Sequence, residues 1–175
     1  MYDALDVSRY VINYSNSKLN GISNLKLQKI LYFIQVYFLI KTKKPCFLDK
    51  IEAWNFGPVI PRVYNEFKQY GASNIHQITR YVEYSKDNIW TAKYRLFNPN
   101  IILKKDKEYI EFIINMFSNY SATELTELTH NQAPWKDAYL KDKEITISKL
   151  IEYFNLTGKK SPSSIGGAMN CPIVF

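Results

Sequence analysis

The sequence predicts a mainly α-helical protein: a compact single-domain helical bundle with a short extended or hairpin segment and a flexible C-terminal tail. Apolar residues recur at helical spacing in several segments that begin with capping residues. The chain has 175 residues, of which 46% are hydrophobic and 22% charged. These values suit one core of ordinary domain size. Because Gly, Ser and Pro gather after Gly158, we expect a helical domain at 1–157 and a tail at 158–175.

The first expected helix runs from Asp3 to about Lys18. Val7, Val11 and Tyr14 fall on one of its faces. Gly21 then breaks the pattern. This face predicts an amphipathic helix that packs on a longer one.

The second expected helix begins at Ser23 or Asn24, which are both good N-cap residues. Its inward stripe consists of Leu27, Leu31, Ile34 and Phe38. Residues 30–40 are apolar or aromatic except for Gln35, but a bilayer needs about 20 such residues. We therefore expect a central helix that is buried on most sides and ends at Lys44-Pro45.

The next segment predicts an extended stretch, a turn and a third helix. Residues 51–54 alternate in polarity, and residues 55–58 have the composition of a turn. Pro61 suits the first turn of the following helix, and Gly71 suits the position just after its end.

Residues 75–103 carry a weaker signal. Two β-prone runs, 81–84 and 89–94, flank residues 85–88, which is compatible with a small hairpin or an irregular loop. The breaker at 98–100 precedes an amphipathic helix. That helix is marked by Tyr109, Ile110, Ile113, Ile114 and Phe117.

Three shorter helices are expected in the last third of the chain. Ser121 and Glu124 form the pattern of a capping box, which predicts a short helix to about Thr129. Pro134 can open the next helix, and Ser148 can cap the last one. The segment after Gly158 either packs back on the domain or is offered to a partner, and the sequence leaves both open.

The net charge is +7, which favours an acidic partner: a nucleic acid, an anionic membrane or an acidic protein. The basic residues are scattered and include no run of the length typical of nucleic-acid patches. Only Cys46 and Cys171 are present, so a disulfide framework is not expected and a reducing compartment fits. With no visible secretion signal, we expect a cytoplasmic protein without a membrane partner.

The sequence offers little material for catalysis. It has two histidines and none of the common hydrolase, nucleotide or zinc motifs, so we expect no enzyme, no metal and no cofactor. The best candidate site pairs Cys46 or Cys171 as nucleophile with His130 as base, oriented by Asp137 or Asn131. Chance explains that combination better than function does.

Two segments could bind a partner or simply pack. Residues 129–135 place hydrogen-bonding groups beside a Trp, and residues 54–61 form a rigid loop with two prolines and two large aromatic side chains. Such a loop suits a pre-organised binding platform, and it equally suits packing between two helices. Packing is the favoured interpretation for both.

Several of these motifs together resemble a known family, the Panacea antitoxin domain, also described as SocA-like and phage-associated. The motifs are Asn24-Leu25-Lys26-Leu27-Gln28-Lys29-Ile30-Leu31-Tyr32, Ile51-Glu52-Ala53-Trp54-Asn55-Phe56-Gly57-Pro58-Val59-Ile60-Pro61, Val63-Tyr64, Tyr70-Gly71, Thr129-His130 and Pro134-Trp135. The resemblance covers about residues 3–71 and 121–154. Residues 75–103 and the tail lie outside it.

The resemblance implies a helical antitoxin that holds a cognate toxin, encoded next to it, inactive by direct protein–protein binding. It brings no catalytic residues. Tyr and Trp are favoured interface anchors, and 14 Tyr with 3 Trp exceed what one core of this size needs. The candidate contact residues are Trp54, Phe56, Tyr64, Trp90 and Trp135.

Other functions stay open at this point. Positive charge also suits a nucleic-acid-binding transcriptional regulator that contacts DNA. One member of the family is known as an adaptor that delivers its toxin to a protease, and the C-terminal tail would then be an obvious tether.

Overall fold

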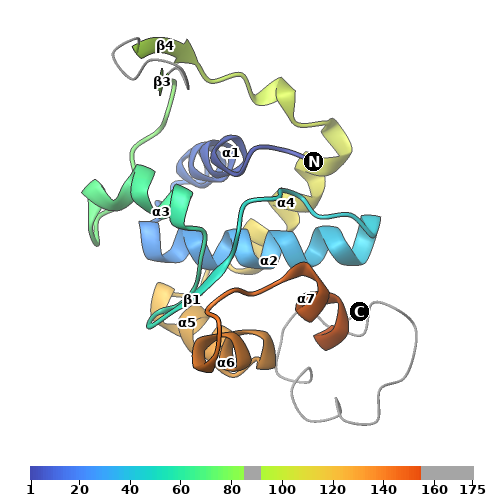
Figure 1. Cartoon of the computed structure of the whole chain (residues 1–175). Coiled ribbons are helices and arrows are strands. Elements are labelled where there is room, and N and C mark those ends of the chain that lie inside the picture. The colour runs from blue at the N-terminus through green and yellow to red at the C-terminus, as the bar shows by residue number, and fades with distance from the viewer. Residues whose placement is uncertain (85–91, 155–175) are drawn as a thin grey trace.

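The structure is a computed structural model that describes residues 1–84 and 92–154 (Figure 1). The expected tail at 158–175 lies outside the described residues. Within them the chain forms seven α-helices and two separate two-stranded antiparallel sheets. The predicted fold class, a mainly helical domain with a short hairpin segment, is confirmed.

The first two helices follow their local signals. Helix α1 spans Ala4–Ser17, and the Asp3 side chain caps it by accepting a hydrogen bond from the Leu5 backbone N–H at 2.8 Å. Helix α2 spans Asn24–Thr42 with Ser23 as its N-cap. Both predictions are therefore confirmed.

Helix α2 is the centre of the molecule. Every residue from 27 to 39 is buried, as expected for a helix covered on most sides. It contacts α1, α3, α4 and α5, and Figure 1 shows it running through the middle of the bundle. No helix in the described part of the chain is long and apolar enough to cross a bilayer.

The segment after α2 forms a short hairpin. Strand β1 spans Glu52–Trp54 and pairs with β2, Gly57–Val59. The prediction of a turn at 55–58 was therefore wrong at its second half, because Gly57 and Pro58 pair with β1 and leave only two residues in the turn. Helix α3 follows at Pro61–Phe67, and a 3₁₀ turn, η1, at Lys68–Tyr70 leads to Gly71 with φ of 54°.

A second hairpin lies in residues 75–103, where the secondary-structure signal of the sequence is weakest. Strand β3 spans Arg80–Tyr84 and pairs with β4, Ala92–Leu96, so this region is a hairpin and not an irregular loop. The described second strand runs two residues further than the expected 89–94, and residues 89–91 lie outside the described part. A 3₁₀ turn, η2, at Pro99–Ile101 precedes α4, Lys104–Met116.

Three short helices complete the described fold. They are α5 at Ala122–His130, α6 at Ala133–Leu140 and α7 at Ile147–Tyr153. The capping box at the start of α5 is present in both directions, as predicted. The prediction that Ser148 caps α7 was wrong: Thr146 is the N-cap and accepts from the Lys149 backbone N–H at 3.2 Å. Thr and Ser are both capping residues, so local sequence did not discriminate between them.

Candidate functional site

The β1–β2 hairpin depends on a glycine in a crowded place. Gly57 has φ of 94°, which favours glycine. A Cβ added there would lie 2.7 Å from Lys29 Cε and 2.8 Å from Thr129 Oγ1. The hairpin therefore sits directly on α2 and α5, at a distance that only glycine permits.

Two polar residues of α2 hold the second strand of this hairpin. The Gln28 Oε1 accepts a hydrogen bond from the Ile60 backbone N–H at 2.9 Å, and Lys29 Nζ donates to the Pro58 carbonyl at 2.9 Å. Both side chains are buried, and the burial lowers the pKa of Lys29 to about 7. The hairpin is thus attached to the core by buried polar groups, which fix a unique geometry.

Helices α5 and α6 hold the other side of the hairpin. Trp135 Nε1 donates to the Trp54 carbonyl at 3.1 Å, and the Tyr139 hydroxyl donates to Asn55 Oδ1 at 3.1 Å. The Trp135 ring stacks on His130, with ring centroids 3.9 Å apart, and on Tyr139, at 4.8 Å. The 129–135 segment therefore does close an interhelical corner, and the hairpin is what it packs against.

The electrostatics of this corner disfavour extra positive charge. Burial is the main cause that lowers the pKa of His130, and the neighbouring Lys29 charge lowers it further, while a hydrogen bond to the Asn55 backbone raises it. His130 Nε2 is buried without a hydrogen-bond partner in the described part of the chain. Two bases with lowered pKa values thus lie beneath the hairpin.

The structure brings most of the predicted contact residues together. Trp54 packs edge-on against Tyr64, with ring centroids 5.0 Å apart, and its backbone carbonyl receives the Trp135 hydrogen bond. Phe56 stands at the turn with 69% of its surface exposed. Trp90 lies outside the described residues. We call the set Trp54, Phe56, Tyr64, His130, Trp135 and Tyr139 the aromatic corner.

The cysteine–histidine candidate finds no support in the geometry. Cys46 is fully buried, and burial strongly raises the pKa of its thiol, which keeps the thiol protonated. The His130 imidazole instead bonds the backbone of Asn55 and stacks on Trp135. Cys171 lies outside the described residues. Among those described, no group of three or more His, Cys, Asp or Glu side chains could hold a metal ion.

Sequence reasoning missed the buried polar anchors Gln28 and Lys29. A signal existed, because a lysine flanked by Leu27, Ile30 and Leu31 on a largely apolar helix requires a partner if it is buried. The identity of that partner, a carbonyl of the β2 strand 29 residues further on, was not readable from local pattern.

The described chain is thus a mainly helical domain with an exposed aromatic side chain on an internally braced turn. The family described as "Antitoxin SocA-like, Panacea domain" matches residues 27–136, and this chain belongs to that family. The resemblance seen in the sequence is confirmed.

A curated relative agrees with this family assignment. Over 137 residues the chain is 32% identical to a protein named "Antitoxin SocA" from Caulobacter vibrioides (strain NA1000 / CB15N), which covers 76% of this chain and 68% of the relative. No solved structure matches the chain. Membership of this family supports an antitoxin role, implies a toxin as partner and suggests regulation more than catalysis.

Proposed function

We propose that this protein neutralises a cognate toxin, encoded next to it, by direct protein–protein binding in the cytoplasm. In this proposal residues 1–157 are the binding domain and residues 158–175 are the C-terminal tail that the sequence predicts. The observation that carries this proposal is Phe56, a large apolar side chain left 69% exposed on a turn that the rest of the aromatic corner holds in place.

Pre-organisation is the physical reason to assign binding to this turn. The chain before Phe56 is held in place, since the Trp54 carbonyl accepts from Trp135 Nε1 and the Asn55 side chain accepts from the Tyr139 hydroxyl. The Phe56 carbonyl lies 3.4 Å from Thr126 Oγ1, whose single hydrogen is closer to the Ala122 carbonyl at 2.9 Å. Little conformational entropy is then lost when a partner covers the ring, so more of the contact energy appears as affinity.

The predicted contact residues divide into two roles in this proposal. Phe56 inserts into the toxin, while the half-buried Trp54, Tyr64 and Trp135 hold the turn and contribute their exposed edges. Trp90 remains a proposed contact.

The test is co-expression of the full chain with the adjacent reading frame, scored by growth rescue and co-purification. We expect the intact chain to rescue growth, and Phe56→Ala to weaken the complex by at least about tenfold, as for a typical interface anchor. Leu48→Ala is the matched control, because Leu48 is also 69% exposed but lies outside the aromatic corner. A harmless neighbour that forms no complex with the intact chain would refute the proposal.

A further inference from the structure

The β3–β4 hairpin has two chemically different faces. Directly paired residues share one face of a two-stranded antiparallel sheet, and alternate residues share it along each strand. The observed register places Tyr81, Glu83, Lys93 and Arg95 on one face, here the inner face, and Arg80, Val82, Tyr94 and Leu96 on the other, here the outer face.

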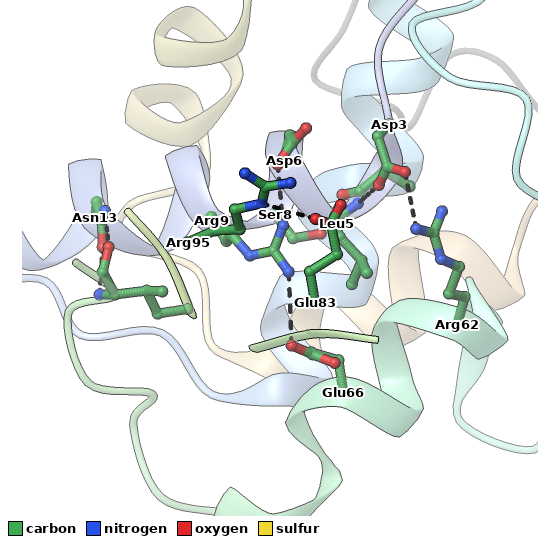
Figure 2. Close-up of polar contacts among 12 residues, drawn as sticks. Asp3, Leu5, Asp6, Ser8, Arg9, Asn13, Arg62, Glu66, Glu83 and Arg95 are labelled. Atoms are coloured by element: carbon green, nitrogen blue, oxygen red, sulfur yellow. Dashed lines mark hydrogen bonds and ion pairs between the residues drawn. The ribbon is translucent and has the colours of Figure 1, made fainter. Parts of the chain in front are cut away.

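The inner face is the polar one, and it is the face that meets α1. The Arg9 guanidinium lies 3.5 Å from the centroid of the Tyr81 ring, and Arg9 is only 4% exposed. Beside it, Arg95 Nε and Glu83 Oε2 form an ion pair at 2.8 Å (Figure 2). Arg9 also pairs with Asp6 at 2.9 Å and with Glu66 at 3.6 Å. The cation–π contact between Arg9 and Tyr81 thus attaches the hairpin to α1, and the ion pair of Arg9 with Glu66 links α1 to α3.

The outer face is apolar and turned to solvent. Tyr94 is 79% exposed and Leu96 is 81% exposed, and the Arg80 guanidinium lies 6.0 Å from the Tyr94 ring centroid. A sheet with one solvated face normally buries its apolar side and exposes its polar side. Here the polar residues Glu83, Lys93 and Arg95 are exposed as well, and Tyr81 makes the contact with Arg9 of α1, so Tyr94 and Leu96 have no cover within the described fold.

The outer face continues into a groove. Leu96 also lines a groove of about 460 Å³ between α1 and the base of the hairpin. Its apolar lining includes Tyr10, Tyr14, Ile78, Leu96, Phe97 and Pro99. Apolar surface that is continuous from a strand to a groove is typical of a protein-binding surface.

The charge around this surface indicates which kind of partner surface would complement it. Arg80 on the outer face is exposed and forms no ion pair with any described residue. The chain carries a net charge of +7. A second copy would bring like charges together, whereas an apolar surface rimmed by carboxylates would complement both properties. A nucleic acid fits less well, because Val82, Tyr94 and Leu96 would face phosphates.

We propose that the outer face of the β3–β4 hairpin and its groove are a second docking surface for the toxin. The toxin surface that it binds is apolar and rimmed by Asp and Glu side chains. This inference rests on the proposed function and deepens it, because it adds a contact area at the far side of α1 from the aromatic corner (Figure 1).

The test uses the full chain and, as its probe, the protein encoded by the adjacent reading frame, made by cell-free synthesis. Leu96→Ser should raise the dissociation constant by at least about tenfold, as expected of an interface anchor. Leu140→Ser is the matched control, since Leu140 is also 81% exposed but lies at the end of α6, and it should leave affinity unchanged. Thermal melts of both variants check that the fold is intact.

A second pair of variants tests the charge. Arg80→Glu should slow association and reduce its dependence on salt, whereas Lys141→Glu, another exposed basic position, should change neither. Equal loss of association rate in both variants would show that only the overall charge matters, and it would overturn the acidic-rim part of the proposal.

The outcomes separate this inference from the function on which it rests. If the intact chain does not bind the probe, the proposed function and this inference both fail. If the intact chain binds and Leu96→Ser binds equally well, the inference alone fails. If Leu96→Ser keeps the protein complex but loses binding to a DNA duplex from the operon promoter, the surface serves a nucleic acid and the inference is overturned.

Discussion

The β1–β2 hairpin is fixed to the helical core by hydrogen bonds from buried side chains of α2 and from the half-buried Trp135 of α6, whereas the β3–β4 hairpin meets α1 through the contact of Tyr81 with Arg9. The strands of β1 and β2 are three residues long and mostly buried, and β4 is exposed along its whole length. Two-stranded hairpins are marginally stable alone, so each depends on what it packs against. The comparison shows that one hairpin belongs to the core, while the other is a surface element that a partner can complete.

This difference predicts different responses to substitution. Changes beneath β1–β2 should cost global stability, because they disturb buried and close-packed groups. Changes on the outer face of β3–β4 should leave stability almost unaltered and alter binding.

The largest effect is expected at Gly57. Gly57→Ala combines a backbone with φ of 94° and a Cβ placed 2.7 Å from Lys29 Cε, so we expect the free energy of unfolding to fall by about 3 kcal/mol. The control is Gly71→Ala, where φ is also positive but no atom lies within 4 Å, and backbone strain alone should cost about 1–2 kcal/mol. Urea unfolding of both variants measures the difference. Equal losses would show that β1–β2 is not close-packed on Lys29.

The next effect concerns pH. Burial lowers the pKa of Lys29 from 10.5 to about 7, so above pH 7 the folded chain releases a proton that the unfolded chain still holds. Stability therefore rises with pH in this range, and we expect this residue to contribute a rise of about 2 kcal/mol between pH 7 and 9. Chemical unfolding across that range should show the rise in the intact protein and in the exposed control Lys141→Met. A rise that persists in Lys29→Met would contradict the assignment.

A smaller effect should follow from the loss of one hydrogen bond in the aromatic corner. Trp135→Phe removes the donor to the Trp54 carbonyl while it keeps an aromatic ring against His130, and it should lower the free energy of unfolding by about 1 kcal/mol. Tyr139→Phe removes the exposed hydrogen bond to Asn55 and should cost less, because water can replace the lost group. Thermal unfolding distinguishes the two. If Trp135→Phe left the free energy of unfolding unchanged, packing alone would hold the turn.

The smallest effect on stability is expected on the outer face of β3–β4. Leu96→Ser should change the free energy of unfolding by no more than about 0.5 kcal/mol, because Leu96 is 81% exposed. Hydrogen exchange should also show faster exchange of the β3–β4 amides than of the β1–β2 amides, since exposed hydrogen bonds open locally. Slower exchange in β3–β4 would show that β1–β2 is the less stable of the two hairpins.

Much of the fold was predictable because its signals are local. The spacing of Val7, Val11 and Tyr14 predicted α1, Ser23 predicted the start of α2, and Ser121 with Glu124 predicted the capping box of α5. Helical periodicity and caps depend on residues three or four apart, so the sequence alone reports them. The last helix shows the limit of this reasoning, since Thr146 rather than Ser148 caps it.

The candidate site was predictable only in part. Trp54, Phe56, Tyr64 and Trp135 were identified by residue type, but their different roles were not, because exposure depends on what the rest of the chain covers. Phe56 is left outside, while Trp135 is turned toward a carbonyl that lies 81 residues earlier in the chain. Distances of that kind are decided by the packing of whole helices.

The sequence by itself therefore determined the class of fold, the places where most helices begin and the family to which the chain belongs. Only the tertiary structure decided that Lys29 is buried beneath Pro58 and that the β3–β4 hairpin turns its apolar face outward. The physical reason is that a helix is stabilised by neighbours along the chain, whereas burial and the orientation of a hairpin depend on groups far apart in sequence that meet only after folding.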